Sequence, residues 1–311
     1  MYRIGIDLGG TNIAAGIVNE EGKIVMQGST PTLATRPFEE VIADMGKLVN
    51  DLLAKYGITA DDVISIGIGS PGAVLNGYVI FSNNLNWKHV PLCDELRKYI
   101  DVPVYADNDA NVAALAESTC GACKGYKNSV TVTLGTGIGG GIVINDKLYG
   151  GSHGVGAEIG HMAIKFDGIR CTCGGIGCWE RYGSATALIR EGKLGMARDS
   201  QSMIYTLAQG DEDKVTAKVV IDAAKAGDKT ACEIFDEYVK NIVVGLINLV
   251  NIFDPDVIAI GGGVAAAGDF LLDAVRECYE ENIFYKDIPH AKIVFAEMGN
   301  DAGIVGAAML S

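Results

Sequence analysis

The residues best suited to bind a metal lie in one short stretch of the chain. His161, Cys171, Cys173 and Cys178 are separated by nine, one and four residues, within a segment rich in glycine. Three thiols and one imidazole can complete a tetrahedral zinc site, and four protein ligands leave no open position for chemistry. The spacing therefore predicts a closed, structural Zn²⁺ site.

Two carboxylates flank this predicted metal site. Glu158 precedes His161 by three residues, and Glu180 follows Cys178 by two. On a helical turn, residues three apart share a face, so Glu158 and His161 are expected side by side. A zinc-bound imidazole also keeps its second ring nitrogen free to donate a hydrogen bond. These groups together suit a small ligand with many hydroxyl groups.

A second cluster of polar residues, Asp107-Asn108-Asp109-Ala-Asn111, directly follows a predicted strand and begins a predicted helix. In doubly wound sheets, ligands gather at the carboxyl ends of the strands, which is the expected place for a catalytic carboxylate. Asp and Asn also cap helices routinely. One member can cap while another points toward a ligand, and position alone does not say which aspartate acts.

Two glycine-threonine loops occur in similar surroundings. Asp7-Leu-Gly-Gly-Thr11 and Thr133-Leu-Gly-Thr136 each follow one predicted strand and precede another, and a third glycine run spans residues 261–263. Glycine leaves backbone amides accessible to phosphate oxygens, and threonine adds a hydroxyl donor. A carboxylate such as Asp7 can hold Mg²⁺ through water. Neither loop has the lysine of the P-loop or the dinucleotide-binding pattern, so the nucleotide would be bound in a different way.

The order of the predicted elements indicates an internal duplication. Strands are expected at 3–8, 13–18, 23–27, 62–69 and 102–106, with helices at 37–56 and 110–120. The layout of strand, glycine loop, strand, turn and strand recurs at 130–134, 139–144 and 147–149, followed by a helix at 230–253 and a strand at 256–260. Alternating strands and helices favour an α/β sheet covered on both faces. We expect two duplicated α/β domains around an interdomain cleft, at 1–115 and 116–299, with a helix at 300–311 packing back on the first.

Composition narrows the class of protein. The chain has 311 residues, a net charge of −14 and eight cysteines. This acidity argues against nucleic acid or an anionic membrane surface as a partner. No segment is apolar over the roughly 20 residues that a membrane helix needs, and a strand-like segment begins at Tyr2, so no secretory signal is expected. We therefore expect a cytoplasmic protein whose cysteines are thiols and metal ligands.

Taken together, these motifs resemble the ROK family of repressors and kinases, most closely its bacterial glucokinases, over essentially the whole chain. The cysteine run ending at Glu180 is the most specific part of the resemblance. It implies two ribonuclease H-like domains of the actin-like ATPase type, and ATP-dependent phosphorylation of glucose at the 6-hydroxyl. It also implies ATP, Mg²⁺ and structural Zn²⁺ as cofactors, and a homo-oligomer, either a dimer or a tetramer.

The resemblance assigns roles residue by residue. Asp109 is the general base. The sugar ligands are Gly72, Asn84, Asn108, Asp109, Glu158, His161 and Glu180. The nucleotide and its metal are held by Asp7, Gly10, Thr11, Thr136, Gly137, Gly262 and Gly263. Zinc is bound by His161, Cys171, Cys173 and Cys178. Cys120 and Cys123 lie outside the pattern.

Three alternatives use overlapping features. A kinase for N-acetylglucosamine, N-acetylmannosamine or fructose would use the same residues with a different pocket shape, and polyphosphate could replace ATP as donor. A sugar-sensing repressor would need a DNA-binding segment ahead of the first glycine loop, which begins at Asp7. An actin-like or chaperone-like ATPase would need neither the metal cluster nor the sugar carboxylates.

Overall fold

The computed structural model describes residues 1–311, which divide into two compact units. The first unit contains residues 1–131, 141–157 and 296–311, and the second contains residues 132–140 and 158–295. The chain therefore passes from one unit to the other four times. The expected domain boundary between residues 115 and 116 stays a prediction.

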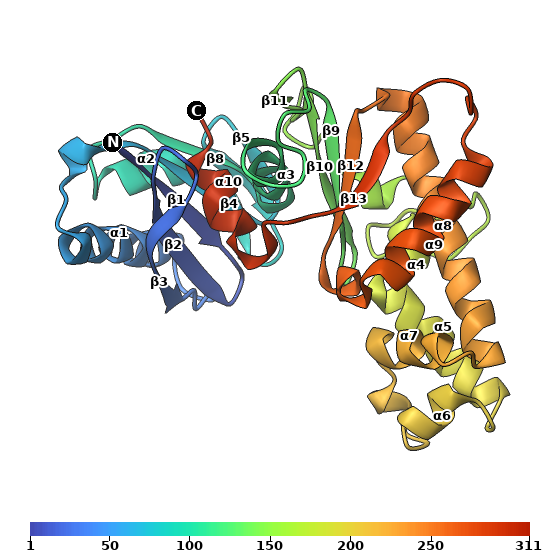
Figure 1. The fold of residues 1–311 in the computed structure, drawn as a ribbon. Coiled ribbons are helices and arrows are strands. Elements are labelled where there is room, and N and C mark those ends of the chain that lie inside the picture. The colour runs from blue at the N-terminus through green and yellow to red at the C-terminus, as the bar shows by residue number, and fades with distance from the viewer. The chain divides into compact units, whose positions relative to one another are not determined.

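A five-stranded sheet forms the centre of the first unit (Figure 1). Its strands are β1 (Tyr2–Leu8), β2 (Asn12–Val18), β3 (Ile24–Pro31), β4 (Val63–Ser70) and β8 (Val104–Asn108), in the order β3-β2-β1-β4-β8. The hairpin strands β1, β2 and β3 pair antiparallel, whereas β4 pairs in parallel with both β1 and β8. The carboxyl ends of β1, β4 and β8 consequently meet at one edge of the sheet.

One helix packs against this sheet through an apolar face. In α1 (Phe38–Tyr56), Val41, Met45, Val49 and Leu52 repeat at helical spacing and are buried in the core of the first unit. α1 ends at Gly57, whose φ of 83° suits glycine as a C-cap. The other helices of this unit are α2 (Leu92–Arg97), α3 (Asp109–Thr119) and α10 (Ala302–Ala308).

The C-terminal helix α10 packs backbone to backbone on the first unit. A methyl group added to Gly5 of β1, Gly67 of β4 or Gly306 of α10 would overlap a carbonyl of Ile304, Ala307 or Val112, respectively. Glycine at these positions lets α10 lie against both β1 and β4 on one side and α3 on the other. A small three-stranded sheet, β5 (Ala73–Leu75), β6 (Tyr78–Ser82) and β7 (Trp87–Val90), completes the unit.

The second five-stranded sheet has the order β11-β10-β9-β12-β13. Its strands are β9 (Ser129–Leu134), β10 (Ile138–Ile144), β11 (Lys147–Leu148), β12 (Val257–Gly261) and β13 (Lys292–Phe295). The helices of the second unit are α4 (Glu180–Gly183), α5 (Ala185–Arg198), α6 (Met203–Leu207), α7 (Ala217–Lys225), α8 (Lys229–Phe253) and α9 (Asp269–Asn282). The division between the units runs through β9 and β10.

The two sheets repeat one strand order, which confirms the predicted duplicated α/β fold. In each, a three-stranded hairpin unit stands first in the chain and two later strands follow at its side. The expected strands and helices are all present, with ends that differ by a few residues. The largest difference is β3, which continues to Pro31 rather than ending at Gln27 because it pairs with β2 along its length.

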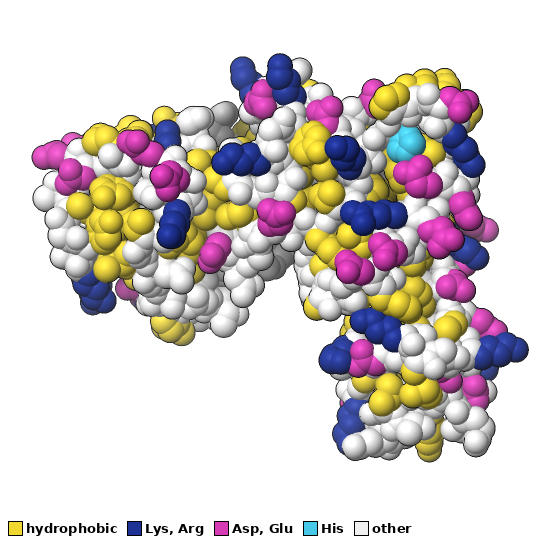
Figure 2. All heavy atoms as spheres, viewed as in Figure 1, with side chains coloured by type: hydrophobic (Ala, Val, Ile, Leu, Met, Phe, Trp, Pro, Cys, Tyr) yellow, Lys and Arg dark blue, Asp and Glu magenta, His cyan; other side chains and the backbone are white.

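No helix has the length and apolar character needed to cross a bilayer. On the face drawn in Figure 2, Lys and Arg side chains are scattered among Asp and Glu.

Candidate active site

Carboxylates gather at the carboxyl edge of the first sheet. The register pairs Asp7 of β1 with Gly69 of β4, and Gly69 with Asp107 of β8. The two aspartates therefore lie at the same level near the ends of β1 and β8, the two strands that flank β4. Burial raises the pKa of Asp7, and the negative charge of Asp109 raises it further. The edge is thus a site of accumulated negative charge, suited to a divalent cation or a proton.

Asp109 is the first residue of α3, and its Oδ1 accepts the amide of Ala110 at 2.8 Å. Asn108 is the N-cap: its Oδ1 accepts hydrogen bonds from the amides of Ala110 at 2.9 Å and Asn111 at 3.3 Å. Desolvation by neighbouring atoms raises the pKa of Asp109, and hydrogen bonds from backbone amides partly oppose this rise. Part of the side chain is nevertheless exposed to solvent. A solvent-reached carboxylate at a helix start can accept a proton from a bound alcohol.

Asn108 also links this edge to the turn after β4. Its Nδ2 donates to the carbonyl of Gly72 at 3.0 Å. Gly72 has a φ of 101°, and an added methyl group would overlap the carbonyl oxygen of Phe81, so only glycine fits. Two of the residues predicted to bind sugar are thus in contact. Since Asn108 Oδ1 is used for capping, one Nδ2 hydrogen is what it can offer a ligand.

Asp107 holds the first turn of α3 in place. Its Oδ1 accepts the Asn108 amide at 2.7 Å and Asn111 Nδ2 at 2.8 Å. Asn111 is only 3% exposed, so the Asn111 side chain supports the start of the helix and is not accessible to a ligand. The sequence pattern alone leaves open which aspartate would act. Asp107 accepts two hydrogen bonds, one of them from a buried side chain, whereas Asp109 accepts the Ala110 amide and its side chain is exposed.

The first glycine loop joins β1 to β2 and is tied down by a buried threonine. Thr32 donates from its hydroxyl to the Gly9 carbonyl at 2.7 Å and from its amide to the Thr11 carbonyl at 2.9 Å. Asn84, in the loop after β6, lies against this hairpin: a methyl group added to Gly10 would be 3.5 Å from Asn84 Cβ. Thr32 is absent from the predicted site because it lies outside the glycine motif.

The second glycine loop joins β9 to β10 and is held by the start of α5. The Gly135 carbonyl accepts the Ala185 amide at 2.8 Å, and the Thr136 carbonyl accepts the Thr186 hydroxyl at 2.7 Å. Gly135 also donates its own amide to the Gly137 carbonyl at 3.0 Å. The loop is therefore a fixed turn whose shape depends on α5, a dependence that the local sequence does not reveal.

Glu180 lies between this loop and the cysteine cluster. A methyl group added to Gly137 would be 2.6 Å from Glu180 Oε2, while Oε1 accepts the Cys171 thiol at 3.0 Å. The preceding residue, Trp179, is fully buried and donates its Nε1–H to the Asn241 carbonyl of α8 at 2.8 Å. Glu180 is thus fixed by a buried anchor on one side and by the cluster on the other.

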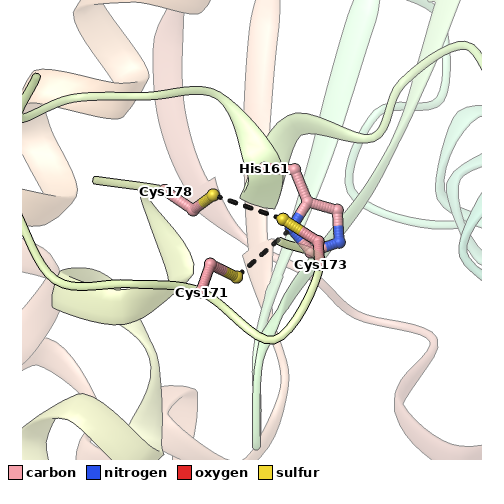
Figure 3. A group of neighbouring side chains, drawn as sticks. All are labelled: His161, Cys171, Cys173 and Cys178. Carbon is pink, nitrogen blue, oxygen red and sulfur yellow. Dashed lines mark hydrogen bonds between the residues drawn. The ribbon is translucent and has the colours of Figure 1, made fainter. Parts of the chain in front are cut away.

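The predicted metal ligands converge on one point, as Figure 3 shows. Their ligand atoms all lie within 4.8 Å of one another. The Cys173 and Cys178 sulfurs are 3.6 Å apart, and Cys171 Sγ is 3.9 Å from His161 Nδ1. Sulfurs bound tetrahedrally to one zinc at about 2.3 Å are separated by about 3.8 Å, so the residues fit the ion.

The cluster is also unsuited to a disulfide or to free thiolates. A sulfur separation of 3.6 Å far exceeds the bond length of about 2.0 Å in a disulfide. Burial raises the pKa of Cys178 to about 12, and burial together with the hydrogen bond to Glu180 raises the pKa of Cys171. The Gly175 amide lowers the pKa of Cys173. A cation would be needed to hold all three sulfurs as thiolates.

Glu158 and His161 lie at the two ends of a single short turn. Glu158 is the N-cap of the 3₁₀ helix Ile159–His161, and its carbonyl accepts the His161 amide at 3.1 Å. Both side chains are exposed. Because His161 directs Nδ1 toward Cys171, its Nε2 is the ring nitrogen that can meet a ligand.

The third glycine run follows β12 and packs against the end of β9, the strand that leads into the second glycine loop. Gly262 has a φ of 85°, and an added methyl group would be 2.5 Å from the Leu134 carbonyl oxygen. Gly263, by contrast, has no atom near the position of an added methyl group and borders a pocket of about 190 Å³. Its other walls come from α7 and the turn at 264–267. The structure thus places Gly262 against Leu134, the residue that leads into the second glycine loop.

Comparison with known proteins identifies the family of this chain. The sequence pattern of the ROK family matches residues 3–311. Glucokinase from Thermotoga maritima is 38% identical, and glucokinase from Streptomyces coelicolor is 37% identical, each across 99% of this chain and 96% of the relative. A solved ROK family glucokinase from Streptomyces griseus, in complex with glucose and AMPPNP, is 37% identical with a TM-score of 0.80, covering 99% of this chain and 98% of that one.

Proposed function

Since the chain belongs to the ROK family, we propose that it is an ATP-dependent glucokinase. It transfers the γ-phosphoryl group of ATP to the 6-hydroxyl of glucose. The observation that carries this function is the full-length similarity, in sequence and fold, to glucokinases, one of them solved with glucose and an ATP analogue. The geometry of each unit supplies groups of the kind that this reaction needs.

Asp109 is the proposed general base. Phosphoryl transfer depends on positioning and on neutralising charge, and the attacking alcohol must lose its proton. Asp109 is exposed to solvent at the start of α3, with one oxygen accepting the Ala110 amide, while Asp107 accepts hydrogen bonds from Asn108 and Asn111. Its raised pKa makes it a better proton acceptor than an ordinary aspartate.

The proposed sugar ligands fall into two groups. In the first unit, Asn108 and Gly72 are joined by a hydrogen bond, and Asn84 lies beside Gly10. In the second, Glu158, His161 and Glu180 offer two carboxylates and one ring N–H. Hexose hydroxyls both donate and accept, so carboxylates, an amide and an imidazole suit them.

The proposed nucleotide ligands are the backbone amides and hydroxyls of the glycine loops. Gly10 and Thr11 in one loop, and Thr136 and Gly137 in the other, would bind phosphate oxygens. Gly262 and Gly263 would lie against the adenosine, next to the pocket of about 190 Å³. Because both loops are anchored by threonines, their amides are already oriented before the nucleotide arrives.

Two metals are proposed as cofactors. Asp7 would hold Mg²⁺ through water, and bound Mg²⁺ neutralises charge on the transferring phosphoryl group. His161, Cys171, Cys173 and Cys178 would hold Zn²⁺, which serves structure because no ligand position remains open. We also propose a homo-oligomer, a dimer or a tetramer, which light scattering would resolve.

A coupled assay of ADP release tests the proposal. The purified protein is supplied with ATP or polyphosphate and with glucose, fructose, mannose, N-acetylglucosamine or N-acetylmannosamine. We expect glucose with ATP to give the highest kcat/KM. A higher kcat/KM for an N-acetylated sugar would refute glucose as the substrate, and ATP hydrolysis that no sugar accelerates would refute a sugar kinase altogether.

A further inference from the structure

A buried carboxylate outside the proposed site ties two distant parts of the first unit together. Glu117, in the last turn of α3, is only 2% exposed. Its Oε1 accepts the Met298 amide at 2.8 Å, and its Oε2 accepts the amides of Ala122 at 2.9 Å and Glu297 at 3.1 Å. The contacts with Glu297 and Met298 bridge about 180 residues of sequence.

This arrangement is not one that stability alone favours. A carboxylate near the C-terminus of a helix opposes the helix dipole, and a buried charge is unfavourable unless it is fully hydrogen-bonded. Glu117 is satisfied by three backbone amides rather than by a cation. An apolar side chain would fill the same space but would accept no hydrogen bond from Glu297 or Met298. The carboxylate therefore fixes the backbone at these two residues, which packing alone would not do.

The segment that Glu117 holds leads directly to the proposed metal-binding carboxylate. Glu297 and Met298 precede a 3₁₀ turn, Gly299–Asp301, which runs into α10. The second residue of α10 is Gly303, and a methyl group added there would be 2.6 Å from both Cγ and Oδ2 of Asp7. The start of α10 is therefore one wall of the space that the Asp7 carboxylate occupies.

The same helix links this wall to the proposed base. Asp109 begins α3 and Glu117 lies eight residues further along it, which corresponds to about 12 Å of helix. α10 also packs directly on α3, where Gly306 meets Val112. Fixing the chain at Glu117 thus fixes the start of α10, beside Asp7, relative to the helix that carries Asp109.

We propose that Glu117 and Gly303 are positioning residues for Asp7. Glu117 fixes the backbone at Glu297 and Met298, and Gly303 leaves the room in which the Asp7 carboxylate keeps its orientation toward the metal-bound nucleotide. This inference rests on the proposed function, in which Asp7 holds Mg²⁺ through water. Neither residue would touch the metal or the substrates.

Metal binding measured without turnover tests the inference. Mn²⁺ replaces Mg²⁺, and the loss of its free electron paramagnetic resonance signal is titrated against protein saturated with ADP. Positioning partners of metal ligands typically change metal affinity by about 10- to 100-fold. We expect Gly303→Ala and Glu117→Gln each to weaken Mn²⁺ binding by about tenfold or more, and to raise the Mg²⁺ concentration for half-maximal rate while KM for glucose stays within about twofold.

Two further variants keep the outcomes distinguishable. Glu297→Gln removes one charge from the held segment but keeps the backbone amide that Glu117 binds, so it should match the wild type.

Asp7→Asn tests the underlying function. If Asp7→Asn leaves Mn²⁺ binding unchanged, the proposed metal role of Asp7 fails. If Asp7→Asn weakens binding while both Glu117→Gln and Gly303→Ala behave like Glu297→Gln, the positioning inference is overturned. Alanine is favourable within a helix, so Gly303→Ala remains informative even if Glu117→Gln fails to fold.

Discussion

A single methyl group on the second glycine loop should report whether Glu180 binds the sugar. In the structure, the β-carbon of Gly137→Ala would be 2.6 Å from Glu180 Oε2, and no other atom outside the Glu180 carboxyl group lies within 4 Å. The contact involves the far end of a flexible side chain, so the carboxylate can move away without unfolding the loop. The substitution therefore displaces Glu180 selectively.

The size of the effect follows from this distance. Non-bonded heavy atoms rest at about 3.5 Å or more, so Glu180 Oε2 must shift by about 0.9 Å. Misplacing a positioning group by about 1 Å can reduce catalysis by about 100-fold. We expect kcat/KM for glucose to fall by about 10- to 100-fold, which corresponds to about 1.4 to 2.7 kcal/mol of transition-state stabilisation.

Gly135→Ala is a matched control in the same loop. A methyl group added at Gly135 meets no atom within 4 Å, and the hydrogen bonds made by its amide and carbonyl are unaffected by a side chain. Both variants are assayed by coupled ADP release at varied glucose with saturating ATP, and then at varied ATP with saturating glucose. Melting temperatures measured by circular dichroism establish that both are folded.

The expected pattern is a large glucose defect in Gly137→Ala and near wild-type behaviour in Gly135→Ala. Equal kcat/KM values for glucose in the two variants would refute a sugar-binding role for Glu180. A rise in KM for ATP alone would also refute it, because the methyl group would then act on the phosphate loop and not through the carboxylate.

Three other outcomes can be measured on the same protein. Asp109→Asn should lower kcat by about 10²- to 10⁴-fold while calorimetric glucose affinity changes little; near wild-type turnover would exclude it as the base. Because a base must be deprotonated to act and desolvation raises the pKa of Asp109, kcat/KM should fall as pH decreases, beginning at a higher pH than an ordinary aspartate would give, and a rate independent of pH throughout the acidic range would contradict this. Elemental analysis should find about one zinc per chain, lost in Cys173→Ser and retained in Cys278→Ser; equal zinc content in these two variants would place the metal elsewhere.

The fold could be predicted largely because its signals are local. The first predicted strand runs into the glycine-threonine loop Asp7 to Thr11, and the glycines indicate where the strand ends. The repetition of that pattern near Leu134 predicts duplication, and both sheets indeed share one strand order. The metal cluster is likewise local, since its four ligands fall within one loop whose glycines allow the chain to fold back on itself.

Contacts between distant side chains could not be predicted in the same way. The glycine motif at Gly9 does not indicate that Thr32 supports it, and nothing near Asp7 points to Gly303. These pairs depend on strand register and on the path of the C-terminal helix. Glu117 is the extreme case, because two of its three partners lie about 180 residues away and contribute only backbone amides, which leave no trace in residue type.

The metal cluster explains how an irregular loop can hold groups with the precision that binding requires. Between Glu158 and Cys178 the chain has one 3₁₀ turn and only two isolated β-bridges, Ala163 with Cys178 and Arg170 with Ile176. Backbone hydrogen bonds such as those from Ile164 to Gly177 and from Cys171 to Gly175 close its turns, but no continuous ladder runs along it. Four bonds to one ion would join His161, at its start, to Cys178, at its end, and Trp179 then anchors the chain to α8. Glu180 comes directly after these residues, so in the proposed zinc-bound protein its carboxylate would be oriented by both the metal and the buried indole. Removing the metal should therefore impair sugar binding, even though the ion would have no direct part in the reaction.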